Sequence, residues 1–301
     1  FDKKGDRIPY EATSTYQALH SNNIFTTQHF YEAKNGNRIP VSVTAAPVIL
    51  HDAAQGTVTV FKDVTREEEV DRMKDEFVSI ASHELRTPMT AIKGLVSMMF
   101  EGRYGEISPA LQKPLTDVAF STDRLIRLVN DLLDVSRLES GKLTIHNTQI
   151  NLYDIIGHSI QEIKPLSDEK KIQIVSEIPH ELWVAADAAR VSQIVSNLLG
   201  NALKFTEKGS ITISYTEQDG MVSVFVKDTG IGILAKNQAK LFGKFQQVFQ
   251  GTEDRPSGTG LGLYISKAMA QKMGGDLWLE KSEVGRGSTF GFSLKKQSKN
   301  S

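Results

Sequence analysis

A sustained heptad pattern between residues 111 and 132 restricts what this chain can fold into more than any other feature. Such spacing places side chains along one stripe of a helix and is typical of helices that pack lengthwise. Ser108 is the expected N-cap, and Pro109 occupies the first helical position. The members recur at alternating steps of four and three residues: Leu111, Leu115, Val118, Thr122, Leu125, Val129 and Leu132. The pattern predicts a long helix whose apolar seam needs a partner helix.

A second long helix is expected just before it, from Arg66 to about Met99. Its start is highly charged, but four apolar residues follow the same spacing of three and four: Val70, Met73, Phe77 and Ile80. Glycines between the two stretches mark a turn, so the helices should form an antiparallel hairpin. Because Ile126 and Leu133 widen the second apolar stripe, the hairpin leaves apolar faces exposed. Pairing with a second copy into a four-helix bundle would cover them.

His83 lies on the first of these helices, in the stretch Phe77–Pro88. At 100° per residue it points about 140° away from the centre of the apolar stripe, which predicts an imidazole in solvent. By itself this is most simply a surface histidine. Its neighbours favour a reactive one: Glu84 is expected at the edge of the stripe, partly buried beside the imidazole, and Thr87 lies one turn further on. Pro88 is expected to bend the helix.

The overall composition excludes some functions. The chain has 301 residues, with 35 basic against 36 acidic ones, and this net charge of -1 gives no global field to hold nucleic acid or an anionic membrane. It has no cysteine, hence no disulfide and no cysteine-based zinc site. No apolar run approaches the ~18 residues of a membrane span. We expect a cytoplasmic fragment, with any membrane anchor of the full-length protein in segments absent from this sequence.

The residues before and after the helical hairpin have strand patterns. At the N-terminus, residues 1–65 predict a short helix followed by strands at 25–31, 38–49 and 57–61, with a hairpin turn at Asn35-Gly36-Asn37. After Gly141 an α/β sandwich is expected. Its strands are predicted at 142–150, 171–178, 209–216, 221–227, 276–281 and 288–294, and its helices near 152–167, 188–205 and 261–273.

Four motifs in the C-terminal part have side chains suited to a nucleotide. Asn197, Asn201 and Lys204 share one helix face, where amide oxygens suit Mg²⁺ and the ammonium can neutralise phosphate. Asp228 precedes Gly230 and Gly232 and can accept from an amino group such as that of adenine. Phe242 and Lys244 supply an aromatic anchor and a cation. The fourth motif opens a helix, where backbone amides favour phosphate: Gly258, Thr259, Gly260, Leu261 and Gly262.

Each motif is weak alone, and competing motifs fail. Thr87 stands where a zinc-protease helix needs its second histidine, residues 258–263 lack the preceding strand of a dinucleotide fold, and no Walker-type Gly-Lys-Ser/Thr occurs. Taken in order, however, the motifs over residues 75–294 resemble the catalytic core of a bacterial sensor histidine kinase. Residues 83–88 match its phosphoacceptor box, 197–205 the N box, 228–232 the first glycine box, 242–245 the F box and 258–262 the second glycine box.

The resemblance implies a multidomain α+β fold. Residues 1–65 resemble the C-terminal part of a PAS sensor domain, residues 66–140 would form a signalling helix and a dimeric four-helix phosphotransfer bundle, and residues 141–301 would form an ATP-binding α/β sandwich. The cofactors would be ATP and Mg²⁺, with Asn201 and Asn197 as metal ligands and Thr289 as a further nucleotide-binding residue. The partners would be a second copy and the receiver domain of a response regulator.

The resemblance also implies that the γ-phosphoryl group of ATP passes to His83 and then to a receiver aspartate. Glu84 is expected to accept a ring proton and orient the imidazole, and Thr87 to place a water that hydrolyses the phosphoaspartate. Lys244 stands where arginine is frequent in the family, which affects the γ-phosphate contact. Two other classes stay open: an ATPase of the same superfamily that acts on protein conformation, and a non-catalytic dimeric sensor that binds nucleotide.

Overall fold

The computed structural model describes residues 1–2, 5–51, 53–246 and 258–297. It divides into two compact units, Phe1–Ala81 and Ser82–Ser301. Their boundary lies inside the long helix α2 (Thr65–Phe100), which contributes residues to both.

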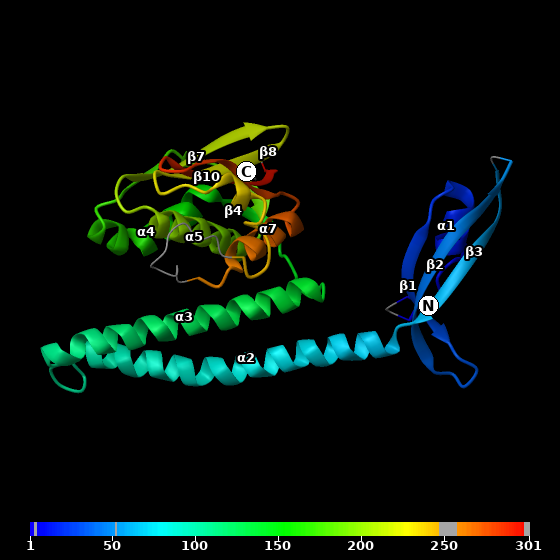
Figure 1. Ribbon diagram of the computed structural model, residues 1–301, viewed down its shortest axis with the longest axis horizontal. Helices are drawn as coiled ribbons and strands as arrows, with labels where there is room; N and C mark the ends of the chain where they lie inside the picture. The colour runs from blue at the N-terminus through cyan, green and yellow to red at the C-terminus, as the bar shows by residue number, and fades with distance from the viewer. Residues whose placement is uncertain (3–4, 52, 247–257, 298–301) are drawn as a thin grey trace. The chain divides into compact units, whose positions relative to one another are not determined.

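The first unit contains an antiparallel sheet with a helix packed on it (Figure 1). Asparagine and glycine form the predicted hairpin turn: Gly36 has a φ of 83°, and Oδ1 of Asn35 accepts a hydrogen bond from the Asn37 backbone at 3.0 Å. The elements are η1 (Tyr10–Ala12), α1 (Ser14–Ser21), β1 (Phe25–Glu32), β2 (Arg38–Leu50) and β3 (Ala53–Asp63), with the strands in the order β1-β2-β3. The three predicted strands and the preceding helix are therefore present.

The second unit begins with a helical hairpin of α2 and α3 (Pro109–Glu139). A guanidinium nitrogen of Arg86 donates to Oδ1 of Asn130 at 2.8 Å, and Nζ of Lys93 lies 2.8 Å from Oδ1 of Asp123. A step of seven residues forward on α2 thus corresponds to seven backward on α3, as in an antiparallel pair (Figure 1). Ser108 is the N-cap of α3 and Pro109 its first residue, as predicted.

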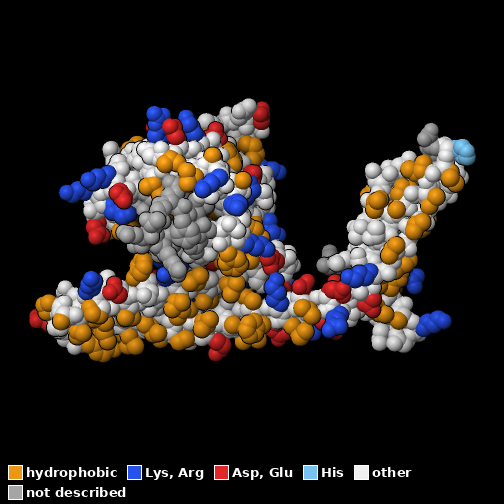
Figure 2. Space-filling view, viewed as in Figure 1, with side chains coloured by type: hydrophobic (Ala, Val, Ile, Leu, Met, Phe, Trp, Pro, Cys, Tyr) orange, Lys and Arg blue, Asp and Glu red, His pale blue; other side chains and the backbone are white. Residues whose placement is uncertain are grey.

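The heptad of α3 is only half covered in the single chain. Thr122 and Val129 are buried, as are Met89 and Val96 on α2. The other heptad position is exposed at all four turns: Leu111 at 54%, Val118 at 43%, Leu125 at 50% and Leu132 at 42%. Figure 2 shows apolar side chains gathered along this hairpin. One seam of the heptad therefore closes the hairpin and the other remains open.

The rest of the second unit is a seven-stranded sheet with a layer of helices on one face (Figure 1). The strand order is β4-β6-β10-β8-β7-β5, with β9 paired to β10, and among these pairs only β5 and β7 are parallel. The strands are β4 (Thr148–Asn151), β5 (Gln173–Ser176), β6 (Trp183–Ala186), β7 (Ser210–Gln218), β8 (Met221–Asp228), β9 (Leu277–Glu283) and β10 (Gly287–Lys296). The helices are α4 (Leu152–Glu169), α5 (Ala188–Phe205), α6 (Ala235–Gln238) and α7 (Gly262–Lys272).

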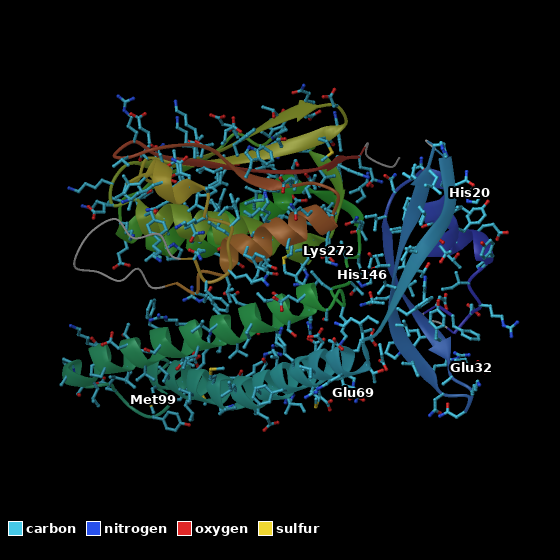
Figure 3. The ribbon with its side chains drawn as sticks, turned by 45° about the vertical axis from the view of Figure 1, so that its right-hand side comes forward. His20, Glu32, Glu69, Met99, His146 and Lys272 are labelled. Atoms are coloured by element: carbon cyan, nitrogen blue, oxygen red, sulfur yellow. The ribbon has the colours of Figure 1, made fainter. Side chains whose placement is uncertain are left out.

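One core fills the space between this sheet and its helices. It contains fully buried residues from α5, β7, α7 and β10, among them Leu199, Ile213, Met269 and Phe292. The helix α3 lies on the helix-covered side of this lobe in both ribbon views, beside α7, whose end is marked by Lys272 in Figure 3. The helices that bear the N box and the second glycine box thus lie between the sheet and α3.

The multidomain fold of helices and sheets is confirmed, with local differences. The strand predicted over 142–150 is confined to Thr148–Asn151, and β6 was not predicted. Both strands have four residues, too few for an alternation of apolar and polar side chains to stand out from the flanking chain. In the described part of the chain no helix is long and apolar enough to cross a bilayer.

Candidate functional site

The phosphoacceptor-type histidine is exposed on α2, as the helix geometry predicts. The side chains of His83 and Glu84 are both 77% exposed, and Nδ1 of His83 lies 3.7 Å from Oε1 of Glu84. The hydroxyl of Thr87 donates to the backbone oxygen of His83 at 3.3 Å, and α2 continues through Pro88. The prediction that Glu84 is partly buried is wrong for the single chain, because the apolar stripe beside it is itself uncovered.

The N box lies on α5, which begins at a well-formed N-cap. Oδ1 of Asp187 accepts from the backbone of Ala189 and Arg190, at 3.1 and 3.3 Å. Three turns later, Nδ2 of Asn197 donates to the Ser266 hydroxyl on α7 at 3.0 Å, and Nδ2 of Asn201 points to Oδ1 of Asn197 at 3.5 Å. The two predicted amides therefore lie together, facing α7.

Lys204 lies where the N box approaches the second glycine box. A Cβ added to Gly258 would lie 3.5 Å from Nζ of Lys204, and this nitrogen is 4.8 Å from the centre of the Phe205 ring. Burial lowers the pKa of Lys204, and the positive charge of Arg124 on α3 lowers it further. An ammonium in this environment gains from a phosphate partner, which would offset both effects.

Asp228 is the buried acceptor of the site. Its Oδ1 accepts from the backbone of Gly230 at 2.8 Å and of Ser288 at 3.2 Å, and the residue is only 6% exposed. Burial raises the pKa of Asp228, against the two hydrogen bonds, which lower it. Among the described residues no donor bonds Oδ2, which leaves this oxygen to accept from a ligand. Thr289 is the next residue after Ser288 on β10, opposite Lys227 of β8.

The first glycine box needs its glycines for space. A Cβ on Gly230 would lie 2.3 Å from the carbonyl oxygen of Phe205, at the end of α5. Gly232 has a φ of 70°, and its Cβ would lie 2.0 Å from the carbonyl oxygen of Glu283. Any larger residue would push the loop away from Asp228. The glycines therefore hold this carboxylate close to the end of the N-box helix.

The second glycine box leads into α7 through a bonded turn. Oγ1 of Thr259 accepts from the backbone of Leu261 at 3.1 Å and donates to Oδ2 of Asp131 on α3 at 2.8 Å. Gly260 has a φ of 70°, which favours glycine, and the side chain of Leu261 is buried in the core. The side chain of Leu261 is therefore closed to a ligand, and its backbone N–H is already bonded to Thr259. Gly262 begins α7, where a Cβ would lie 2.4 Å from Oδ1 of Asn197.

The F box borders the same region. The Phe242 ring packs against the core, with Nζ of Lys267 4.9 Å from its centre. Lys244 forms an ion pair with Glu139 at the end of α3, which raises the pKa of this lysine, and it lies 5.3 Å from the Tyr264 ring. The Phe242 ring therefore lies at the edge of the core, and the predicted cation, Lys244, is paired with α3.

Acidic residues of α3 that contact the C-terminal lobe were missed by sequence reasoning. Asp131 bonds Thr259, and burial raises the pKa of Asp131. Asp134 accepts from Nε2 of Gln193 at 2.8 Å and lies 3.5 Å from a guanidinium nitrogen of Arg190. The signal in the sequence was two aspartates three residues apart next to an apolar seam, and a solvated face gives the same pattern.

The fold and this geometry agree with two family models. The model described as "His Kinase A (phospho-acceptor) domain" matches residues 73–141, and "Histidine kinase-, DNA gyrase B-, and HSP90-like ATPase" matches residues 186–298. Sensor protein GacS of Pseudomonas syringae pv. syringae is 35% identical over 242 residues, which cover 77% of this chain and 26% of that protein. Sensor histidine kinase WalK of Bacillus subtilis is 34% identical over 250 residues, covering 81% and 40%.

Two solved structures are similar. The crystal structure of full-length ShkA in complex with AMPPNP matches with a TM-score of 0.60 and 28% identity, covering 75% of this chain and 47% of that one. Acinetobacter baumannii histidine kinase AdeS shares the fold, with a TM-score of 0.51, 22% identity and coverage of 72% and 98%.

A phosphoacceptor-type hairpin followed by an ATPase-type sandwich defines a two-part catalytic core. Residues 73–298 form this core, and through it the chain belongs to the bacterial sensor histidine kinases. It spans between 26% and 40% of the length of the two curated relatives described here.

Proposed function

We propose that this protein is an ATP-dependent protein-histidine kinase of a two-component system. It would phosphorylate itself on His83 and then transfer the phosphoryl group to an aspartate of a response regulator. The observation that carries this proposal is that one chain combines a 77% exposed imidazole on a phosphoacceptor helix with a buried carboxylate, Asp228, whose loop packs against the end of the N-box helix. The match to an AMPPNP complex of ShkA supports the use of ATP.

Different residues of the site would bind the adenine and the phosphates of the nucleotide. Oδ2 of Asp228 would accept from the adenine amino group, and Thr289 would line the same end of the site. Lys204 and the backbone of residues 258–262 would face the phosphates, because a partly buried ammonium and exposed amides both favour anions. Phe242 and Lys244 would border the site, Lys244 after release from Glu139.

The donor set also fits a magnesium ion bound with the nucleotide. Mg²⁺ prefers oxygen ligands and usually keeps few protein ligands beside substrate phosphates. The amide oxygen of Asn201 meets this need, and it lies one turn from Lys204 on the same helix. Both amide atoms of Asn197 are engaged by neighbours, so we assign the ligand role to Asn201 and a supporting role to Asn197. When bound, the ion would neutralise charge on the transferred phosphoryl group.

The transfer itself needs a neutral imidazole. Nε2 of His83 would attack the γ-phosphorus while the bond to the bridging oxygen of ADP breaks, and ADP leaves with those electrons. Nδ1 then loses its proton to Glu84, which at 3.7 Å needs only a small rotation to reach hydrogen-bond distance.

The partners follow from the surface of the hairpin. The uncovered seam of α3, from Leu111 to Leu132, would pair with a second copy to give a dimeric four-helix bundle. His83 lies beside a shallow hollow lined by Arg86, Thr87 and Thr90, where a receiver domain would present its aspartate. Thr87 would place the water that hydrolyses the phosphoaspartate. We expect the Thr87→Ala protein to phosphorylate itself normally but to dephosphorylate its partner roughly tenfold more slowly.

The organisation predicted from the sequence completes the proposal. Residues 1–65 would be part of a PAS-like sensor domain, residues 66–140 the signalling helix and phosphotransfer hairpin, and residues 141–301 the ATP-binding domain. These domains would act in the cytoplasm.

Incubation with γ-labelled ATP tests the function. We expect acid-labile, alkali-stable label on the protein, absent in His83→Ala and retained in His158→Ala, which removes another exposed histidine on α4. Release of phosphate without labelled protein would instead identify an ATPase. Binding of ATP with neither label nor release would identify a non-catalytic sensor.

A further inference from the structure

The two asparagines of the N box have different surroundings. Asn197 uses both ends of its amide: Nδ2 donates to the Ser266 hydroxyl at 3.0 Å, and Oδ1 faces Nδ2 of Asn201 at 3.5 Å. Ser266 lies on α7 and is 2% exposed. A row of three polar side chains therefore runs from α7 to the amide assigned to the metal.

The direction of each hydrogen bond in this row is set by its neighbour. An amide has one accepting and one donating end, so Asn201 can present its oxygen to a cation only if its nitrogen points to Asn197. Asn197 must then offer its oxygen to Asn201 and turn its own nitrogen toward α7. The row needs an acceptor at that end, and the Ser266 hydroxyl provides it.

The packing of α7 leaves little space around the Asn197 amide. Gly262 lies one turn before Ser266, and a Cβ there would come within 2.4 Å of Oδ1 and 3.2 Å of Nδ2 of Asn197. The glycine thus gives the Asn197 amide its space, and the serine gives it its orientation. Ser266 does not need to touch the nucleotide for this.

We propose that Ser266 is a positioning residue for Mg²⁺, acting through Asn197 to orient the oxygen of Asn201. This inference rests on the proposed function and deepens it, since it names a residue that sets the metal affinity of the same site. Neighbours that orient metal ligands commonly change metal affinity when they are replaced.

The experiment measures the affinity for AMPPNP by calorimetry, once with Mg²⁺ and once with EDTA. The ratio of the two affinities is the gain that the metal gives. We expect Ser266→Ala to reduce this gain about tenfold while the affinity in EDTA stays unchanged. Ser159→Ala is the matched control, because Ser159 is equally buried, at 1%, and donates only to its own helix, to the backbone oxygen of Ile155.

The outcomes separate the inference from the function on which it rests. If the unmodified protein shows no AMPPNP binding with Mg²⁺, the proposed function fails. If it binds but Ser266→Ala keeps the full metal gain, or loses affinity equally with and without Mg²⁺, the role of Ser266 is overturned and the function stands. Ser266→Cys is a second variant in case Ser266→Ala misfolds. Because a thiol is a weaker acceptor than a hydroxyl, we expect a gain in affinity from Mg²⁺ between those of the unmodified protein and Ser266→Ala. An unchanged gain in Ser266→Cys would also overturn the role of Ser266.

Discussion

The phosphoacceptor helix and the nucleotide-binding lobe differ in how they hold their functional side chains. His83 and Glu84 are surface side chains that share one contact of 3.7 Å, whereas Asp228 is buried and fixed by two backbone donors. The imidazole has to be reached by two different reagents in turn, the nucleotide and the receiver aspartate. The carboxylate has to recognise one ligand repeatedly in one orientation.

This difference has an energetic side. Removing an exposed side chain on α2 leaves no cavity and no unpaired buried group, so catalysis there is separable from stability. In the lobe, Gly230 and Gly262 have no room for even one extra carbon, so changes of function and folding are coupled. The comparison predicts which substitutions alter activity alone and which alter both.

The largest effect is expected at Asp228, where binding and stability should move in opposite directions. In Asp228→Asn the retained oxygen can still accept from Gly230 and Ser288, but an amide nitrogen replaces Oδ2 and cannot accept from an adenine amino group. We expect AMPPNP affinity to fall roughly 100-fold. Asp219→Asn, in the exposed β7–β8 turn, should bind normally.

The same variant should be at least as stable as the unmodified protein at neutral pH. Because burial raises the pKa of Asp228, the folded protein binds this proton more tightly than the unfolded chain. The ionised group therefore costs stability above its folded pKa, and the cost disappears as the pH falls through it. Denaturant unfolding should show a stability advantage for Asp228→Asn at neutral pH that narrows as the pH is lowered. If the difference in unfolding free energy between the two proteins instead grew as the pH fell, the role of burial would be contradicted.

Glu84→Gln should separate the chemical step from nucleotide binding. An amide cannot take the proton from Nδ1 of His83, so label transfer should slow by about 30-fold, within the range of general-base effects. The melting temperature and AMPPNP affinity should not change, since the side chain is 77% exposed. Glu106→Gln, before α3, is the control. Autophosphorylation at the unmodified rate would remove Glu84 from the mechanism.

Gly262→Ala should couple binding to stability. Its Cβ would displace the Asn197 amide, so we expect about tenfold weaker AMPPNP binding with Mg²⁺ and a loss of roughly 1–3 kcal/mol in unfolding free energy. Gly200→Ala on α5 meets nothing within 4 Å and should gain about 0.5–1 kcal/mol instead. Equal effects at the two glycines would mean that space around Asn197 is not limiting.

The sequence indicated candidate residues better than the contacts around them. Asn201, Lys204 and Asp228 could be proposed as site residues because their motifs follow one another in the order of a known family, although each motif is weak alone. The exposure of His83 followed from helix geometry alone. The partial burial of Glu84 was predicted wrongly, because neighbouring apolar residues were assumed to be covered within one chain.

Contacts made only by the fold could not be predicted. Ser266 is an ordinary small residue on a helix, and nothing in the spacing shows that its hydroxyl meets Asn197, 69 residues away. The same holds for Asp131, whose partner Thr259 is 128 residues away. Long-range pairs of this kind depend on how α3 and α7 pack on the lobe, which local periodicity does not encode.

The smallest effect is expected at Asp131, where the two regions meet. Its carboxylate accepts from Thr259, within the loop proposed to hold the phosphates, so its negative charge opposes an anionic ligand. Asp131→Asn keeps an accepting oxygen and removes the charge. We expect about threefold tighter AMPPNP binding, a gain that shrinks as salt is raised. Asp117→Asn, exposed on the same helix, should have no effect, and if Asp131→Asn also had none, α3 would not influence the nucleotide through charge.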